Sequence, residues 1–127
     1  MTTIDRPFVN SQAGAEARRE PRRQVGWRGH LVTEDGRRYS VRIVDISISG
    51  AGLLGDDKLA MAQPVILEAQ VPRLPLLDGH AVQRWRATVA FQTFRGQSLR
   101  SGVKFQDLTA DDQALLRAWV ERHAGGR

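Results

Sequence analysis

The sequence predicts a small, mainly β protein: an antiparallel barrel or sandwich followed by one helix. In several short stretches apolar residues alternate with polar ones, and turn-forming residues separate these stretches without any helical spacing between them. Only the C-terminal segment has apolar residues at helical intervals. Six short strands joined by turns are typical of all-β folds, and 127 residues suffice for a single domain.

The first two strands form a predicted hairpin around the turn at 34–36. One parity is apolar in both strands: Val25, Trp27 and Leu31, then Tyr39, Val41 and Ile43. After Ile43 the apolar residues become even-numbered, beginning with Val44 and Ile46. Such a one-residue slip predicts a bulge or the end of the strand near Asp45.

Four further strands are expected, at 51–54, 64–71, 82–94 and around 103–105, the last one after a turn at 96–98. In the strand 82–94, Trp85, Ala87, Val89 and Phe91 share one parity, so we expect all four to face the interior. Phe94 falls outside this pattern.

The C-terminal segment reads as a capped helix over about 109–123. Thr109 and Asp112 have the spacing of a capping box, and Gly125 and Gly126 favour its end. An apolar stripe at helical spacing predicts packing against the β domain: Leu115, Leu116, Trp119 and Val120. We expect a flexible tail at 1–17, a domain at 18–123 and disorder at 124–127.

Composition restricts the classes of function. The chain has no cysteine, which excludes disulfides, thiolate zinc sites and cysteine nucleophiles. His30, His80 and His123 lack metal-ligand spacing, and the glycines at 50–55 lack the Lys of a phosphate-binding loop. We therefore expect neither catalysis nor a metal or cofactor. No stretch has the length of a membrane span or a signal peptide, so a cytoplasmic location is expected.

Arginine dominates the positive charge. The net charge is +5, only two lysines occur, and seven arginines lie between positions 18 and 38. The guanidinium group matches phosphate oxygens and the O6/N7 edge of guanine with a fork of donors. A phosphate-bearing ligand and a solvated basic surface both agree with this composition.

The first candidate motif is the segment 18–23. It contains two overlapping pairs at four-residue spacing, Arg18/Arg22 and Arg19/Arg23, and Pro21 favours an extended backbone. Such a pair can hold a phosphate or a guanine. A basic cluster beside a flexible tail is the alternative interpretation.

The second candidate motif is the segment 45–50, at the predicted strand end. The Asp45 carboxylate can accept two parallel hydrogen bonds from N1–H and N2–H₂ of guanine. Ser47 shares its parity, so both side chains face one side if the segment is extended. Gly50 is expected to provide a turn with positive φ. A strand end with a polar turn is the alternative interpretation.

The order RxxxR, a hairpin, then DxSxxG resembles the signature of PilZ domains, and the last strand and helix are similar to the end of that family. The resemblance covers about residues 18–123. It implies a six-stranded antiparallel barrel with a C-terminal helix and cyclic di-GMP as ligand. The arginines of the family correspond best to Arg19 and Arg23, with Arg18 and Arg22 as the other register. Its aspartate, serine and glycine correspond to Asp45, Ser47 and Gly50.

The function expected from this resemblance is a cyclic di-GMP receptor. Binding would order the N-terminal arginine segment and signal to a downstream partner protein. One alternative is a protein-interaction module with the same fold that does not use the ligand. Another is a barrel that binds single-stranded nucleic acid, although Trp27, Trp85, Phe91 and Phe105 are expected inside rather than available for base stacking.

Overall fold

The computed structural model describes residues 20–72 and 80–125. Its elements are β1 (Arg23–Thr33), β2 (Arg38–Ile46), β3 (Gly50–Gly55), β4 (Pro64–Pro72), β5 (His80–Arg95), β6 (Ser98–Phe105) and the helix α2 (Ala110–Gly125). The predicted tail at 1–17, with the candidates Arg18 and Arg19, lies outside the described residues.

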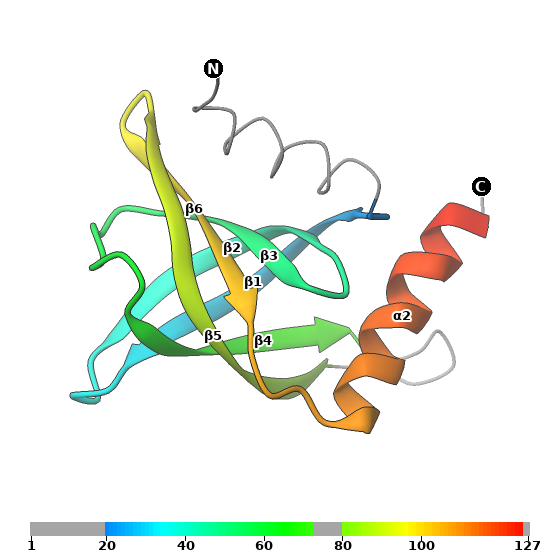
Figure 1. Ribbon diagram of the computed structural model, residues 1–127. Helices are drawn as coiled ribbons and strands as arrows, with labels where there is room; N and C mark the ends of the chain where they lie inside the picture. The colour runs from blue at the N-terminus through cyan, green and yellow to red at the C-terminus, as the bar shows by residue number, and fades with distance from the viewer. Residues whose placement is uncertain (1–19, 73–79, 126–127) are drawn as a thin grey trace, which may run out of the picture.

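The six strands form a closed antiparallel barrel in the order β1-β2-β3-β6-β5-β4 (Figure 1). Closure comes from β1, which pairs with β2 on one side and with β4 on the other. The predicted six-stranded barrel is therefore confirmed. Every strand has two neighbours, which removes the open edges that a flat sheet of this size would have.

The barrel interior is filled by the side chains that the alternating pattern predicted to face inward. Leu31, Ile43, Leu67 and Trp85 are essentially inaccessible to solvent. Burial of such side chains is the main favourable term in folding, at roughly 1.5–3 kcal/mol for each large apolar group. Trp27 and Phe105 are also buried, as predicted.

Phe91 departs from the prediction. Its side chain is 46% exposed, because the pairing of β5 with β6 shifts by one residue between Val89 and Phe91. Such a bulge turns the following side chains to the opposite face. The extra residue of this bulge, Ala90, is recognisable only from the pairing of β5 with β6.

The predicted change in the alternation of side chains near Asp45 is confirmed. The pairing of β2 with β3 shifts between Ile43 and Asp45, and β2 ends one residue later at Ile46. Asp45 and Ile46 are both buried. The bulge thus turns a carboxylate out of the apolar interior without exposing it to solvent.

Helix α2 packs beside the start of β1 (Figure 1). The capping box is confirmed, since the Asp112 amide donates to Thr109 Oγ1 (3.0 Å) and the Thr109 amide to Asp112 Oδ2 (3.2 Å). Leu116 and Val120 are buried in the main core. The helix extends to Gly125, two residues past the predicted end. No described helix has the length and apolarity to cross a membrane.

Candidate functional site

Ser47 organises the turn between β2 and β3. Its side chain is fully buried, and its Oγ accepts hydrogen bonds from the amides of Ser49 (3.2 Å) and Gly50 (3.1 Å). The Ser47 amide in turn donates to the Gly50 carbonyl oxygen (2.9 Å). The hydroxyl satisfies backbone donors that the end of a strand leaves free. The Ser47 side chain therefore points into the β2–β3 turn and stabilises the shape of the segment 45–50.

Gly50 has a different role from the predicted one. The described glycines with positive φ are Gly36 and Gly96, so the expected positive φ at Gly50 is wrong. Gly50 opens β3 and pairs with Lys104, and a Cβ at this position would overlap the carbonyl oxygen of Val103. A glycine is needed here because the backbones of β3 and β6 approach closely.

Asp45 lies at the centre of the site and is only 5% exposed. Its Oδ1 accepts hydrogen bonds from Arg22 Nη2 (2.9 Å) and the Gly52 amide (3.1 Å), and its Oδ2 from Arg100 Nη2 (2.9 Å). A buried carboxylate needs such partners to offset its lost hydration. The structure thus brings together Asp45 and Arg22, two residues that the sequence placed in separate motifs.

Arg100 is a member of the site that the sequence analysis missed. It lies on β6, 55 positions after Asp45, and its side chain is 28% exposed. Nothing in its local sequence distinguishes it from other strand arginines. Only the pairing of β3 with both β2 and β6 brings Arg100 to the carboxylate.

Arg23 points away from Asp45 and toward the helix. Its Nη1 donates to the carbonyl oxygen of Trp119 (3.1 Å), and its guanidinium lies 4.6 Å from the centre of the Trp119 ring. Trp119 in turn packs edge-on against Trp27, with ring centres 5.3 Å apart. Of the two described motif arginines, Arg22 contacts the predicted guanine-reading residue and Arg23 contacts α2.

A pocket of about 370 Å³ opens beside Arg22. Asp45 is not among its lining residues but bonds Arg22, so we call it the Asp45-side pocket. Its lining includes Glu20, Arg22, Gly50, Phe91, Gly102 and Lys104. Glu20 also accepts a hydrogen bond from Ser49 Oγ (2.5 Å), so the chain lies across the β2–β3 turn before it enters β1. The pocket therefore joins the ends of both motifs.

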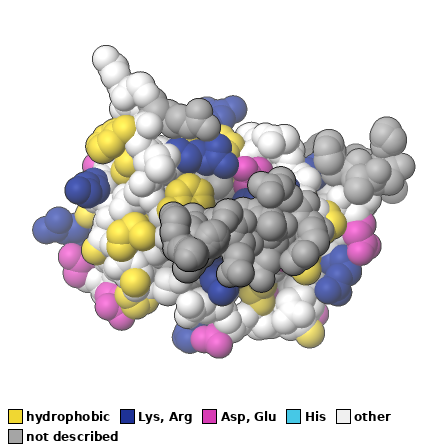
Figure 2. Space-filling model, turned by 45° about the horizontal axis from the view of Figure 1, so that its top comes forward, with side chains coloured by type: hydrophobic (Ala, Val, Ile, Leu, Met, Phe, Trp, Pro, Cys, Tyr) yellow, Lys and Arg dark blue, Asp and Glu magenta, His cyan; other side chains and the backbone are white. Residues whose placement is uncertain are grey.

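Phe91 is a second residue that the sequence analysis missed, because its parity predicted an interior position. Its ring covers Gly102, where a Cβ would overlap the ring atoms. The bulge in β5 thus places a partly exposed aromatic ring on the wall of the Asp45-side pocket. On the molecular face drawn in Figure 2, hydrophobic side chains likewise lie next to Lys and Arg side chains.

The chemistry of this arrangement suits a planar, anionic ligand. Arg22 and Lys104 offer positive charge beside one acid, Glu20, and Phe91 offers an aromatic surface. The Asp45 carboxylate lies behind Arg22, to which it is bonded. Within the described residues, no three His, Asp or Glu side chains gather as metal ligands would. A nucleotide base with phosphates matches all three features.

The sequence profile of the PilZ domain family matches residues 16–122. No curated protein matches the sequence significantly.

Several solved structures share the fold. The inhibitor of motility MotI/DgrA from Bacillus subtilis aligns with a TM-score of 0.70 at 15% identity, over 85% of this chain and 51% of the other. This chain therefore spans about half the length of that protein. The PilZ domain of YcgR from Escherichia coli with c-di-GMP aligns with a TM-score of 0.63 at 16% identity, over 84% and 92% of the two chains. The MrkH–c-di-GMP complex from K. pneumonia gives 0.63 at 16% identity, over 84% and 52%.

Proposed function

Because the chain belongs to the PilZ domain family, we propose that it is a receptor for cyclic di-GMP that signals to a partner protein and catalyses no reaction. The observation that carries this proposal is the contact between Arg22 and the buried carboxylate of Asp45. It joins the arginine motif and the DxSxxG motif at the edge of one pocket. Structural relatives that were solved with c-di-GMP support the choice of ligand.

In the proposed mechanism the ligand exchanges partners with Arg22. Guanine N1–H and N2–H₂ donate to Asp45 in place of the Arg22 guanidinium. Arg22, whose side chain is 37% exposed, then turns to a phosphate or to guanine O6/N7. Arg100 and the Gly52 amide continue to hold the carboxylate in position. Ser47 and Gly50 maintain the shape of the β2–β3 turn and do not contact the ligand directly.

These contacts favour the register Arg18/Arg22 over the register Arg19/Arg23. Arg22 is adjacent to Asp45, whereas Arg23 is occupied by Trp119. Arg18 and Arg19 precede Glu20, which contacts Ser49 at the pocket. We therefore assign Arg22 as the principal described arginine for the ligand, with Arg18 and Arg19 as additional contacts when the N-terminal segment closes over it.

A second function is a protein-interaction module with this fold that does not use the ligand. The observation that favours it is that both oxygens of Asp45 already have partners within the protein. In this case the two motifs would serve only the stability of the barrel.

Calorimetric titration with cyclic di-GMP tests the proposal. We expect Arg22→Ala and Asp45→Asn to weaken binding by about 10- to 100-fold, because each removes a hydrogen bond to a charged group worth roughly 1.5–3 kcal/mol. Asn replaces Asp with the same shape, so the barrel should still fold. Arg28→Ala, an exposed arginine of β1 outside the pocket, is the matched control and should bind as the wild type does.

Three results would redirect the proposal. A folded wild type without heat of binding would support the interaction module. Loss of binding in Arg23→Ala but not in Arg22→Ala would favour the register Arg19/Arg23. Equal weakening by Arg28→Ala would indicate a general effect of charge. Thermal unfolding of each variant confirms that the comparison concerns folded protein.

A further inference from the structure

Strands β2, β1, β4 and β5 present a group of arginines on the outside of the barrel. Up to the bulges in β2 and β5, their even-numbered residues point outward, since odd-numbered ones such as Leu31, Leu67 and Trp85 are buried. Among the described outward residues of these strands, Glu68 is the only acid. The outward arginines, which we call the arginine face, are Arg28, Arg38, Arg42, Arg84 and Arg86.

Two members of the arginine face oppose each other directly. The pairing of β1 with β2 places Arg28 opposite Arg42, and both are exposed. Neither makes an ion pair or side-chain hydrogen bond with any residue in the described ranges 20–72 and 80–125. Like charges at directly opposed positions destabilise a sheet. The barrel itself gains nothing from this pair, which leaves two guanidinium forks available to an external anion.

Glu68 organises two other members of the face. It accepts hydrogen bonds from Arg38 Nη2 (2.6 Å) and Arg84 Nε (2.7 Å), and its side chain is nearly buried. Arg38 and Arg84 are 51% and 69% exposed. The carboxylate therefore fixes both guanidinium groups while their remaining donors face solvent, and the three residues keep a net positive charge.

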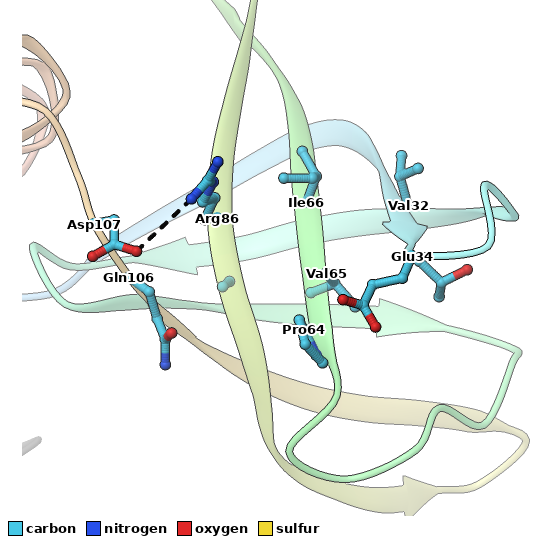
Figure 3. Close-up of a pocket in the computed structure, with 10 residues that line it drawn as sticks. Val32, Glu34, Pro64, Val65, Ile66, Arg86, Gln106 and Asp107 are labelled. Atoms are coloured by element: carbon cyan, nitrogen blue, oxygen red, sulfur yellow. Dashed lines mark ion pairs between the residues drawn. The ribbon is translucent and has the colours of Figure 1, made fainter.

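An apolar pocket of about 310 Å³ borders the arginine face (Figure 3). Val32, Pro64 and Ile66 contribute apolar surface to it. Val32 pairs with Ile66 and Ile66 with Arg86, so these three residues lie side by side on β1, β4 and β5. On the rim, Arg86 approaches Asp107 only to 4.0 Å, and both side chains are more than 70% exposed. This weak contact leaves Arg86 available.

We propose that the arginine face docks an acidic segment of a partner protein, with an apolar side chain of that segment in the Val32–Ile66 pocket. Carboxylates of the segment would pair with Arg28, Arg42 and Arg86, because guanidinium groups bind carboxylates in a bidentate manner. The juxtaposition of an apolar pocket and exposed arginines matches a chain in which acidic and apolar residues are neighbours.

Nucleic acid fits the same face less well. Single strands bind through base stacking on aromatic rings. The exposed rings of these strands, Phe91 and Phe94, follow the bulge in β5 and lie beside β6, away from Arg84 and Arg86, which pair with β4. A duplex offers phosphates but no apolar group for the pocket.

This inference rests on the proposed function in one respect: a receptor needs a partner to which it signals. The arginine face and the Asp45-side pocket share no residue, so the two proposals can fail separately. Cyclic di-GMP titrated into each variant shows whether the ligand site is intact, independently of partner docking.

The experiment uses the full chain and a fluorescein-labelled peptide of glutamates and serines with one central leucine. Anisotropy measures its affinity, and amide chemical shifts locate its contacts. The double variant Arg28→Glu/Arg42→Glu is compared with Lys58→Glu/Arg117→Glu, which changes the net charge equally at exposed positions between β3 and β4 and on α2. We expect the first double variant to bind about tenfold more weakly than the second. Shifts should concentrate at Val32, Ile66 and Arg86.

Three outcomes would overturn the proposal. Equal weakening in both double variants would show attraction by net charge alone. Equal affinity for a peptide with alanine in place of leucine would show that the pocket is unused. Tighter binding of a DNA or RNA duplex to the same residues would assign the face to nucleic acid. If the charge reversal prevents folding, Arg28→Gln/Arg42→Gln provides the same comparison.

Discussion

Asp45 receives one arginine from the segment before β1 and another from β6. Its carboxylate is nearly buried, so an incoming group must replace the donors that it displaces or leave a charge unpaired. Two parallel N–H donors on the edge of guanine meet this requirement, whereas an uncharged group with one donor does not. For the proposed ligand, we therefore expect Asp45 to favour a guanine over other bases.

Phe91 provides a prediction at the level of one side chain. We expect Phe91→Leu to cost about 1–3 kcal/mol of cyclic di-GMP binding free energy, because a base stacked on the ring would lose its aromatic contact. Phe94→Leu is the matched control, since Phe94 is 70% exposed on the same strand and does not line the Asp45-side pocket. Calorimetric titration of both variants compares them. Equal affinities would show that Phe91 is not a stacking surface.

At the scale of elements, β1 and α2 are joined by Arg23. Its guanidinium donates to the carbonyl oxygen of Trp119 in α2 and lies over the Trp119 ring. Both interactions favour a positively charged side chain at this position. Arg23 follows the proposed ligand contact Arg22 in the chain. It nevertheless links β1 to α2 and does not contact Asp45.

We expect Arg23→Ala to lower the free energy of unfolding by about 1–3 kcal/mol, the sum of a hydrogen bond to a charged group and a cation–π contact. Arg117→Ala, which removes an exposed arginine from α2, is the control and should change stability by less than about 0.5 kcal/mol. Urea denaturation monitored by tryptophan fluorescence measures both. A wild-type stability for Arg23→Ala would contradict this role.

The Glu68 carboxylate links β2, β4 and β5 and predicts a pH dependence. The guanidinium groups of Arg84 and Arg38 lower the pKa of Glu68. Because the pKa is lower in the folded state than in the unfolded chain, this residue stabilises the barrel above the unfolded value of about 4.3. The stabilisation is lost as pH falls through the folded pKa.

Glu68→Gln tests this link, since glutamine keeps the shape and removes the charge. We expect the variant to be less stable than the wild type at neutral pH and the difference to shrink as pH falls below about 4.3. Urea denaturation at a series of pH values measures the difference. A constant difference across this range would mean that the charge of Glu68 does not contribute.

For the whole molecule, β1 connects the two proposed surfaces. It begins beside Arg22 at the Asp45-side pocket, and its later residues Arg28 and Val32 lie on the arginine face. A ligand that draws the N-terminal segment onto the barrel therefore acts at one end of the strand whose other end is proposed to contact the partner. Such coupling requires differential contacts of the ligand with the open and closed states.

Limited trypsin digestion tests the closure of the N-terminal segment. We expect cyclic di-GMP to slow cleavage after Arg18 and Arg19, because bound residues are less available to the protease. Cleavage after the exposed Lys58, between β3 and β4, serves as the internal control and should not change. Equal rates at Arg18 and Arg19 with and without ligand would contradict the closure, provided that calorimetry shows binding.

The sequence by itself determined the features that depend on neighbouring residues. The parity of Trp27, Leu31 and Ile43, the slip at Asp45 and the capping box at Thr109 all result from local geometry, which repeats along one strand or one helical turn. The motifs around Arg22 and Asp45 were likewise recognisable from their spacing. Six strands with short turns then favour a barrel.

Only the tertiary structure decided which residues meet. Phe91 reaches the Asp45-side pocket because a bulge arises from its pairing with β6, and Gly50 is a glycine because the same strand approaches its backbone. Arg100 joins Asp45 across 55 positions, and Arg22 and Arg23 separate toward different partners. These outcomes depend on strand register and on contacts distant in sequence, which the pattern of a single strand does not encode.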